Sequence, residues 1–166
     1  MPPVNLEQEA ARITDELGRV VFVGAVAVNH YARFRESRDI DLVAASPIDE
    51  AKLLTLGYRR RAGSRSSWYS PRGIQCDFFT KDVGGIPVWW ILETSVSVKA
   101  GKKTVRVVSL EGLILAKYRA GRTQDIADLR HLIGRRSSDI RWDVMSEIGT
   151  DQEVIELKHV AKALGF

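Results

Sequence analysis

The stretch VVFVGAVAVNHYARFRESRDIDLVA, residues 20–44, decides the fold, because two strands, a glycine and a pair of acids follow one another closely in it. It opens with an apolar, mostly β-branched run, which predicts a buried strand that ends at Gly24. A helix is expected from residue 25 to about residue 34. A second strand is expected over residues 39–45, and period-two alternation sends its two acidic side chains to one face.

Asp39 and Asp41, the acids of that second strand, carry the chemical argument. Two carboxylates two residues apart on a strand lie about 7 Å apart on one face, so both can reach one divalent ion. Asp77 is a third acid in the otherwise apolar strand expected over residues 74–79, where a buried carboxylate without a partner is costly. Phosphoryl-type transfer needs metal ions and positioning more than covalent chemistry. Asp39, Asp41 and Asp77 are therefore candidate catalytic residues and candidate ligands for Mg²⁺ or Mn²⁺.

The same stretch resembles the signature of the DNA polymerase β-type nucleotidyltransferase superfamily. Within it, the chain resembles the small prokaryotic members that include the abortive-infection (AbiEii-like) toxins. Their signature is a strand ending in Gly-Gly or Gly-Ser, a helix, and then Arg-x-Thr/Ser-x-Asp-hydrophobic-Asp. Gly24 and Ala25 stand at the first part, although Ala25 departs from the small Gly or Ser found there. The second part is matched by Arg35, Ser37, Asp39 and Asp41.

The resemblance implies a nucleotidyltransferase fold, an NTP substrate, and a triphosphate held by Gly24, Ala25, Arg35 and Ser37. A second match, in residues 110–133, resembles the family's C-terminal helix pair. It implies that Lys117 and Arg122 face the nucleotide, and that Asp125 and Asp128 shape the rim or fix the helix.

Each of these C-terminal residues also has an ordinary structural interpretation. Lys117 can be a lysine whose stem covers an amphipathic helix, and Asp125 can favour a helix dipole from the first turn. Both interpretations stay open at this point. Trp89 and Trp90 fit the core better than a platform for base stacking.

The distribution of charge suggests a polyanionic partner. The net charge is only +4, but residues 59–72 contain no acid and several arginines. A cluster of this kind suits RNA, such as a tRNA end, or nucleotide phosphates, and it suits a solvated basic face equally well. The candidate acceptor-binding residues are Arg59, Arg60, Arg61, Arg65 and Arg72.

Cysteine usage and hydropathy favour a cytoplasmic protein with no membrane partner. Cys76 is the single cysteine, and no apolar run approaches the roughly 20 residues that span a bilayer. A reducing compartment is therefore expected.

The order of expected elements indicates an α+β protein with a mixed β-sheet flanked by helices and a helical C-terminal part. A sheet domain is expected over residues 1–108 and a packed helical region over 109–166, together forming one compact unit. Further helices are expected over residues 5–17, 48–56, 110–120, 125–133, 140–148 and 152–164. Hairpins are expected over residues 58–69 and 94–108.

Several functions remain compatible with these residues. The leading hypothesis is an Mg²⁺-dependent transfer of a nucleoside monophosphate from an NTP to a hydroxyl acceptor, with RNA favoured and a toxin–antitoxin role, including a cognate antitoxin, in view. The alternatives are an antibiotic-modifying nucleotidyltransferase and a non-catalytic binder of RNA, nucleotide or protein. The sequence does not determine the NTP, the acceptor or the oligomeric state.

Overall fold

The computed structural model describes residues 5–33 and 35–166. Its strands are β1 (Val20–Phe22), β2 (Asp39–Ala44), β3 (Arg59–Arg60), β4 (Ser67–Tyr69), β5 (Gln75–Phe79), β6 (Asp82–Val83), β7 (Ile86–Pro87), β8 (Val96–Ala100) and β9 (Lys103–Val107). Its helices are α1 (Leu6–Leu17), α2 (Gly24–Tyr31), α3 (Glu50–Thr55), α4 (Val88–Thr94), α5 (Leu110–Ala120), α6 (Thr123–Arg136), α7 (Trp142–Met145) and α8 (Asp151–Ala163), with a 3₁₀ turn at Ser137–Asp139.

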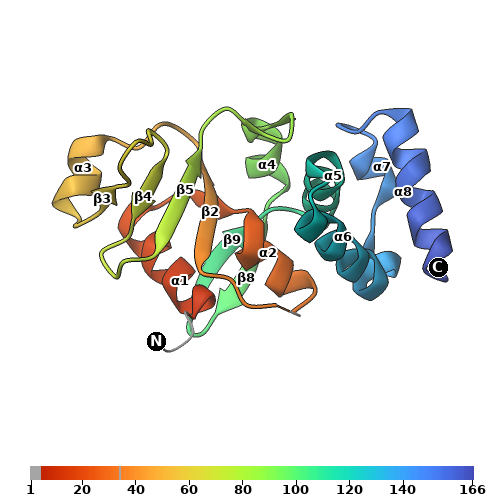
Figure 1. The fold of residues 1–166 in the computed structure, drawn as a ribbon, viewed down its shortest axis with the longest axis horizontal. Helices are drawn as coiled ribbons and strands as arrows, with labels where there is room; N and C mark the ends of the chain where they lie inside the picture. Colours follow the sequence, from red (N-terminus) through yellow and green to blue (C-terminus); the bar gives the residue numbers. More distant parts are fainter. Residues whose placement is uncertain (1–4, 34) are drawn as a thin grey trace.

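The central sheet is seven-stranded and mixed, in the order β3-β4-β5-β2-β1-β9-β8, and β6 and β7 form a separate small hairpin (Figure 1). β1 runs antiparallel to β2 and parallel to β9. β2 runs parallel to β5, so two strands distant in sequence lie side by side at the centre. This arrangement confirms the expected α+β class with a mixed sheet.

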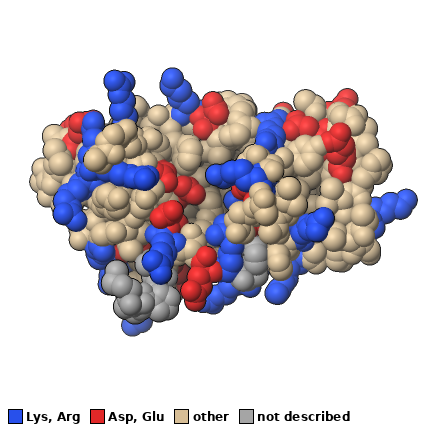
Figure 2. All heavy atoms as spheres, in the orientation of Figure 1, with Lys and Arg blue, Asp and Glu red and all other residues tan. Residues whose placement is uncertain are grey.

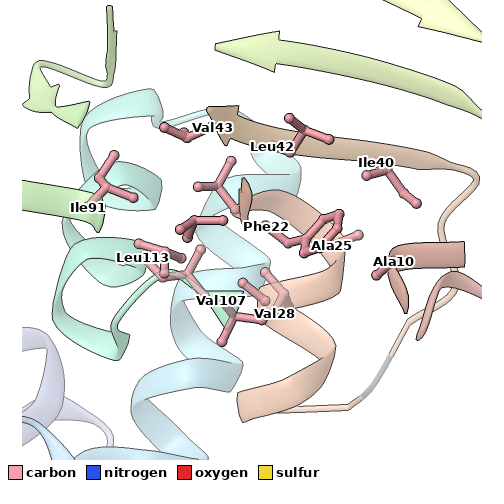
Figure 3. Close-up of a cluster of buried hydrophobic side chains, with 14 of the residues drawn as sticks. Ala10, Phe22, Ala25, Val28, Ile40, Leu42, Val43, Ile91, Val107 and Leu113 are labelled. Carbon is pink, nitrogen blue, oxygen red and sulfur yellow. The ribbon is translucent and has the colours of Figure 1, made fainter. Parts of the chain in front are cut away.

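Period-two alternation on β2 separates a core face from a polar face. Ile40 and Leu42 are fully buried, whereas Asp39 is exposed and Asp41 is half-buried. Ile40 and Leu42 belong to the same core as Ala10 of α1 and Ala25 of α2 (Figure 3). The predicted split of β2 into an apolar and an acidic face is therefore confirmed.

Local signals in the sequence also set the first helix. The Asn5 side chain accepts a hydrogen bond from the Gln8 backbone N–H at 3.0 Å, which caps α1. The helix ends before Gly18, whose φ of +82° is a backbone conformation that favours glycine.

Some elements differ from the expectations. α4 was not expected, because its β-branched and aromatic residues have low helix propensity. It buries Trp90, whose indole N–H donates to Glu147 at 2.9 Å, but leaves Trp89 60% exposed, so the core assignment holds for Trp90 and is wrong for Trp89. α7 is a short segment inside the longer helix expected over residues 140–148. α2 ends at Tyr31, and residue 34 lies outside the described residues.

All sheet strands precede α5, and the helices after it gather on one side of the sheet (Figure 1). α5 and α6 contact α2, which joins the two regions. The division at residues 108 and 109 stays a prediction. Among the described helices, none combines the length and apolar character that crossing a membrane requires.

Candidate active site

Asp41 of β2 and Asp77 of β5 form a cross-strand pair at the centre of the sheet. They stand opposite each other in the parallel register, so both side chains lie on the same face. Asp39 lies on the same face two residues before Asp41, opposite Gln75, and is exposed. Within the described ranges, no three acidic, histidine or cysteine side chains converge on a point where one metal ion could sit. The structure therefore brings Asp41 and Asp77 together and leaves Asp39 beside them.

The Asp41 carboxyl is in an unfavourable place for a negative charge. Burial raises its pKa to about 6, and the nearby charges of Asp77 and Asp39 act in the same direction, while Lys117 opposes them. A divalent cation is a counter-charge that such a pair of carboxylates could bind.

Gly24 lets the Asp41 carboxylate lie against the first residue of α2. A Cβ atom on Gly24 would lie 2.1 Å from Asp41 Oδ2, so any other residue would displace that oxygen. The start of a helix also presents unpaired backbone N–H groups and positive potential. Asp41 and Asp77 could hold Mg²⁺ beside the start of α2, with phosphate oxygens and water completing its coordination.

Two polar side chains that the sequence analysis missed contact Asp77. The Ser67 hydroxyl on β4 donates a hydrogen bond to Asp77 Oδ1, and the Gln75 amide donates to Asp77 Oδ2 at 3.4 Å. Part of the signal was present, because Ser-Pro-Arg-Gly at residues 70–73 is a typical turn. Counting outward from residues 70–73 alone would place Ser67 opposite Cys76. The Ser70 N–H instead bonds the Ile74 carbonyl at 2.8 Å, which makes the loop one residue longer and brings Ser67 opposite Asp77.

A second group of charges, which we call the buried charge network, lies on the helical side. It consists of Arg35, Lys117, Arg122, Asp125 and Asp128. Asp128 accepts two hydrogen bonds from Arg35, at 2.8 and 3.0 Å, and an ion pair from Lys117 at 2.9 Å. Asp125 pairs with Lys117 at 3.1 Å and with Arg122 at 2.6 Å.

The carboxylates of this network are buried yet favour the charged form. Burial acts to raise the pKa of Asp125 and of Asp128, but their hydrogen bonds from the surrounding cations outweigh it and lower both. The positive charge of Lys117 acts on Asp41, and the negative charge of Asp41 acts on Arg122. Lys117 and Arg122 therefore form a positive edge of the network on the side of the acid pair.

Comparison with known proteins bears on this arrangement. A family model described as "nucleotidyl transferase of unknown function" (DUF2204) matches residues 5–159. The chain belongs to this family. No curated protein sequence matches it. An antigenic nucleotidyltransferase-like protein from Paracoccidioides brasiliensis has a similar crystal structure, with a TM-score of 0.58 and 16% identity over 99% of this chain and 94% of that one.

These findings confirm the superfamily and the nucleotidyltransferase fold of this chain. The likeness in structure shows the fold alone, because sequence identity is low. The finer resemblance to abortive-infection toxins stays a prediction.

The residues predicted to hold a triphosphate have different surroundings. Ala25 is 4% exposed and packs in the core, so its side chain serves packing (Figure 3). The Ser37 hydroxyl faces the Asp39 backbone N–H at 3.4 Å and supports the turn before β2. Arg35 and Lys117 are held by the buried charge network, while Arg122 remains 79% exposed at its edge.

The predicted acceptor-binding arginines also differ in their surroundings, because some are held in ion pairs and others are exposed. Arg72 is bound to Glu9 at 2.8 Å and to Glu16 at 2.7 Å, which ties the β4–β5 turn to α1 and argues against a role in acceptor binding. Arg60 pairs with Glu50 and lies over the Trp68 ring. The exposed remainder is Arg59, Arg61 and Arg65. Figure 2 shows acidic side chains in the middle of one face, over β2 and β5, with basic side chains over β3 and β4 beside them.

Proposed function

We propose that this chain transfers a nucleoside monophosphate from an NTP to a hydroxyl acceptor. The observation that carries the proposal is the Asp41–Asp77 pair, opposite in register on β2 and β5 and set against the start of α2 at Gly24. Two adjacent, half-buried carboxylates without a cation between them are unfavourable in a purely structural role. A metal-bound triphosphate would relieve that cost.

In this reaction the acceptor oxygen attacks the α-phosphorus, the bond from that phosphorus to the bridging oxygen of the β-phosphate breaks, and pyrophosphate leaves. Asp77 takes the proton of the acceptor hydroxyl. Asp41 and Asp77 would hold Mg²⁺ or Mn²⁺, with Asp39 as the third carboxylate beside them. Bound metal supplies neutralisation of the charge that develops on the phosphoryl oxygens.

The positive edge of the buried charge network supports triphosphate binding opposite the acids. Arg122 is exposed and Lys117 lies within reach of the Asp41 charge, so both can meet phosphate oxygens. Asp128 and Asp125 would then act as supports that fix these cations.

The favoured acceptor is RNA, such as a tRNA end. Arg59, Arg61 and Arg65 are exposed on and near the β3–β4 hairpin, which adjoins the strand that carries Asp77. Exposed arginines beside a catalytic centre suit a phosphate backbone. A toxin–antitoxin role is part of the proposal through the resemblance in sequence, with growth arrest on expression as its test.

The test is transfer of label from each α-³²P-labelled NTP, in separate reactions with Mg²⁺ or Mn²⁺, onto total tRNA. Label that depends on one NTP and disappears in Asp41→Asn would establish the reaction and its nucleotide. Asp49→Asn, which changes an exposed α3 capping residue, is the matched control and should keep full transfer. Growth arrest by the wild type but not by Asp41→Asn would support the toxin role.

A second candidate function is non-catalytic binding of nucleotide or RNA. Ala25 favours it, because this departure from the signature packs in the core and offers no hydroxyl to a phosphate. Equilibrium binding of NTP or RNA without transfer to tRNA, small-molecule hydroxyls or protein would support this function and contradict the first.

A further inference from the structure

We infer that Ser67 is a positioning residue, whose hydroxyl fixes the orientation of the Asp77 carboxylate for the reaction. The inference rests on the proposed function, because it assigns a task to Asp77. It adds a residue that lies outside both stretches that carry the resemblance in sequence, residues 20–44 and 110–133.

Ser67, Asp77 and Asp41 form one row across three neighbouring strands. Ser67 is opposite Asp77 in the antiparallel β4–β5 register, and Asp41 is opposite Asp77 in the parallel β2–β5 register. Side chains in such a row share a face and touch their neighbours. Asp77 therefore has a hydroxyl donor on one side and an acid on the other.

The two acids of this row are held very differently. Asp77 Oδ1 accepts from Ser67, and Asp77 Oδ2 accepts from the amide of Gln75 at 3.4 Å. The Asp41 carboxyl instead lies against Gly24, and burial and the Asp77 charge oppose its negative charge. Ser67 thus holds Asp77 Oδ1 on the β4 side, and Oδ2, with its longer hydrogen bond from Gln75, keeps a lone pair for a cation or an acceptor proton.

The surroundings of Ser67 suit a fixed donor. The residue is 8% exposed, and the Ser64 hydroxyl accepts a hydrogen bond from its backbone N–H at 3.0 Å. Its carbonyl accepts from the Arg61 backbone N–H at 2.9 Å. A donor held on both sides of its peptide loses little freedom when it orients a carboxylate, and groups that orient metal-binding carboxylates typically affect affinity or activity by about 10–100-fold.

The test compares Ser67→Ala, which removes the donor, with Ser67→Thr, which keeps it. Ser66→Ala is the matched control, because Ser66 is the exposed neighbour. Three quantities are measured: kcat and KM for the NTP in the transfer assay, Kd for Mn²⁺ by electron paramagnetic resonance without substrate, and the Asp77 rotamer in a crystal structure of each variant.

For Ser67→Ala we expect a kcat lower by about 10–100-fold, an NTP KM within about two-fold of the wild type, and a weaker Mn²⁺ Kd by about 10-fold. The Asp77 carboxylate should turn from its wild-type orientation. Ser67→Thr and Ser66→Ala should stay close to the wild type in every measurement.

An unchanged Asp77 rotamer in Ser67→Ala would overturn the inference, whether or not transfer is ever found. A loss of kcat in Ser67→Ala that is accompanied by a loss of thermal stability, and that Ser67→Thr does not rescue, would also overturn the inference. Such results would mark Ser67 as a folding residue. Absence of transfer in the wild type, with a turned Asp77 in Ser67→Ala, would contradict the proposed reaction and leave the positioning of Asp77 supported.

Discussion

Two pairs of aspartates in the described part of the chain, Asp41 with Asp77 on the sheet and Asp125 with Asp128 on α6, differ in their counter-charges. Asp125 and Asp128 are buried, yet Arg35, Lys117 and Arg122 lower the pKa of both. At the other pair, burial and Asp77 raise the Asp41 pKa to about 6. The difference separates a self-contained structural tie from a pair that, under the proposed function, takes its counter-charge from a bound metal ion.

The largest effect is expected from breaking the tie. Asp128→Ala leaves Arg35 and Lys117 without a buried partner and should lower the free energy of unfolding by about 3–5 kcal/mol. Urea unfolding at pH 7 measures it. Asp139→Ala is the matched control, because that aspartate pairs with Arg136 at an exposed position and should cost less than about 1 kcal/mol. Similar costs for both variants would contradict the role given to Asp128.

Asp41→Asn should change the free energy of unfolding in the opposite direction and stabilise the protein. The folded protein holds the Asp41 proton more tightly than the unfolded chain, since its pKa is raised from 3.8 to about 6. The negative charge therefore costs stability, and that cost appears as pH rises from about 4 to about 6. Without metal, Asp41→Asn should raise the free energy of unfolding at pH 7 by about 1–3 kcal/mol.

The pH dependence provides the check on that stabilisation. The gain from Asp41→Asn should shrink toward zero near pH 4, where the wild-type carboxyl is protonated in both states. Mg²⁺ or Mn²⁺ should stabilise the wild type and not the variant. A variant that is less stable than the wild type at pH 7 would disprove the account of the acid pair.

Gly24→Ala should displace Asp41 at a stability cost of about 1 kcal/mol, since the end of a side chain gives way more readily than backbone. The φ angle of Gly24 is not positive, so the new methyl group alone carries the effect. In an Asp41→Ala background the same change should be neutral or stabilising, because alanine favours helix. A double-mutant cycle measures this coupling, and strict additivity would rule out the contact.

Arg122→Ala should have the smallest effect on stability, within about 0.5 kcal/mol, because the pair with Asp125 is largely exposed on the arginine side. Under the proposed function it should still weaken the NTP Kd by about 10-fold, since a charge-assisted hydrogen bond to phosphate is lost. Arg130→Ala, on an exposed position of the same helix, is the control for net charge. Equal NTP affinity of both variants would remove Arg122 from the site.

Local patterns predicted most of the fold and the acid face. Alternation in β2, the helix expected over residues 5–17 and the apolar strand around Asp77 each depend on neighbouring residues, and each is found as expected. The partners of the arginines could not be predicted in this way. Arg72 meets Glu9 and Arg35 meets Asp128 across separations of 63 and 93 residues, which only the packed helices determine. α4 was missed because its local composition favours a strand over the helix that packing stabilises.

The contact between Gly24 and Asp41 has a consequence for the history of the family. Asp41 costs stability at neutral pH, so a lineage that stopped using the site would be released from keeping it. Once Asp41 is replaced by a smaller residue, the space beside α2 admits a side chain at position 24. Drift should therefore change these two positions together while leaving Asp128 in place, and relatives that have gained a side chain at position 24 should be those that have abandoned catalysis.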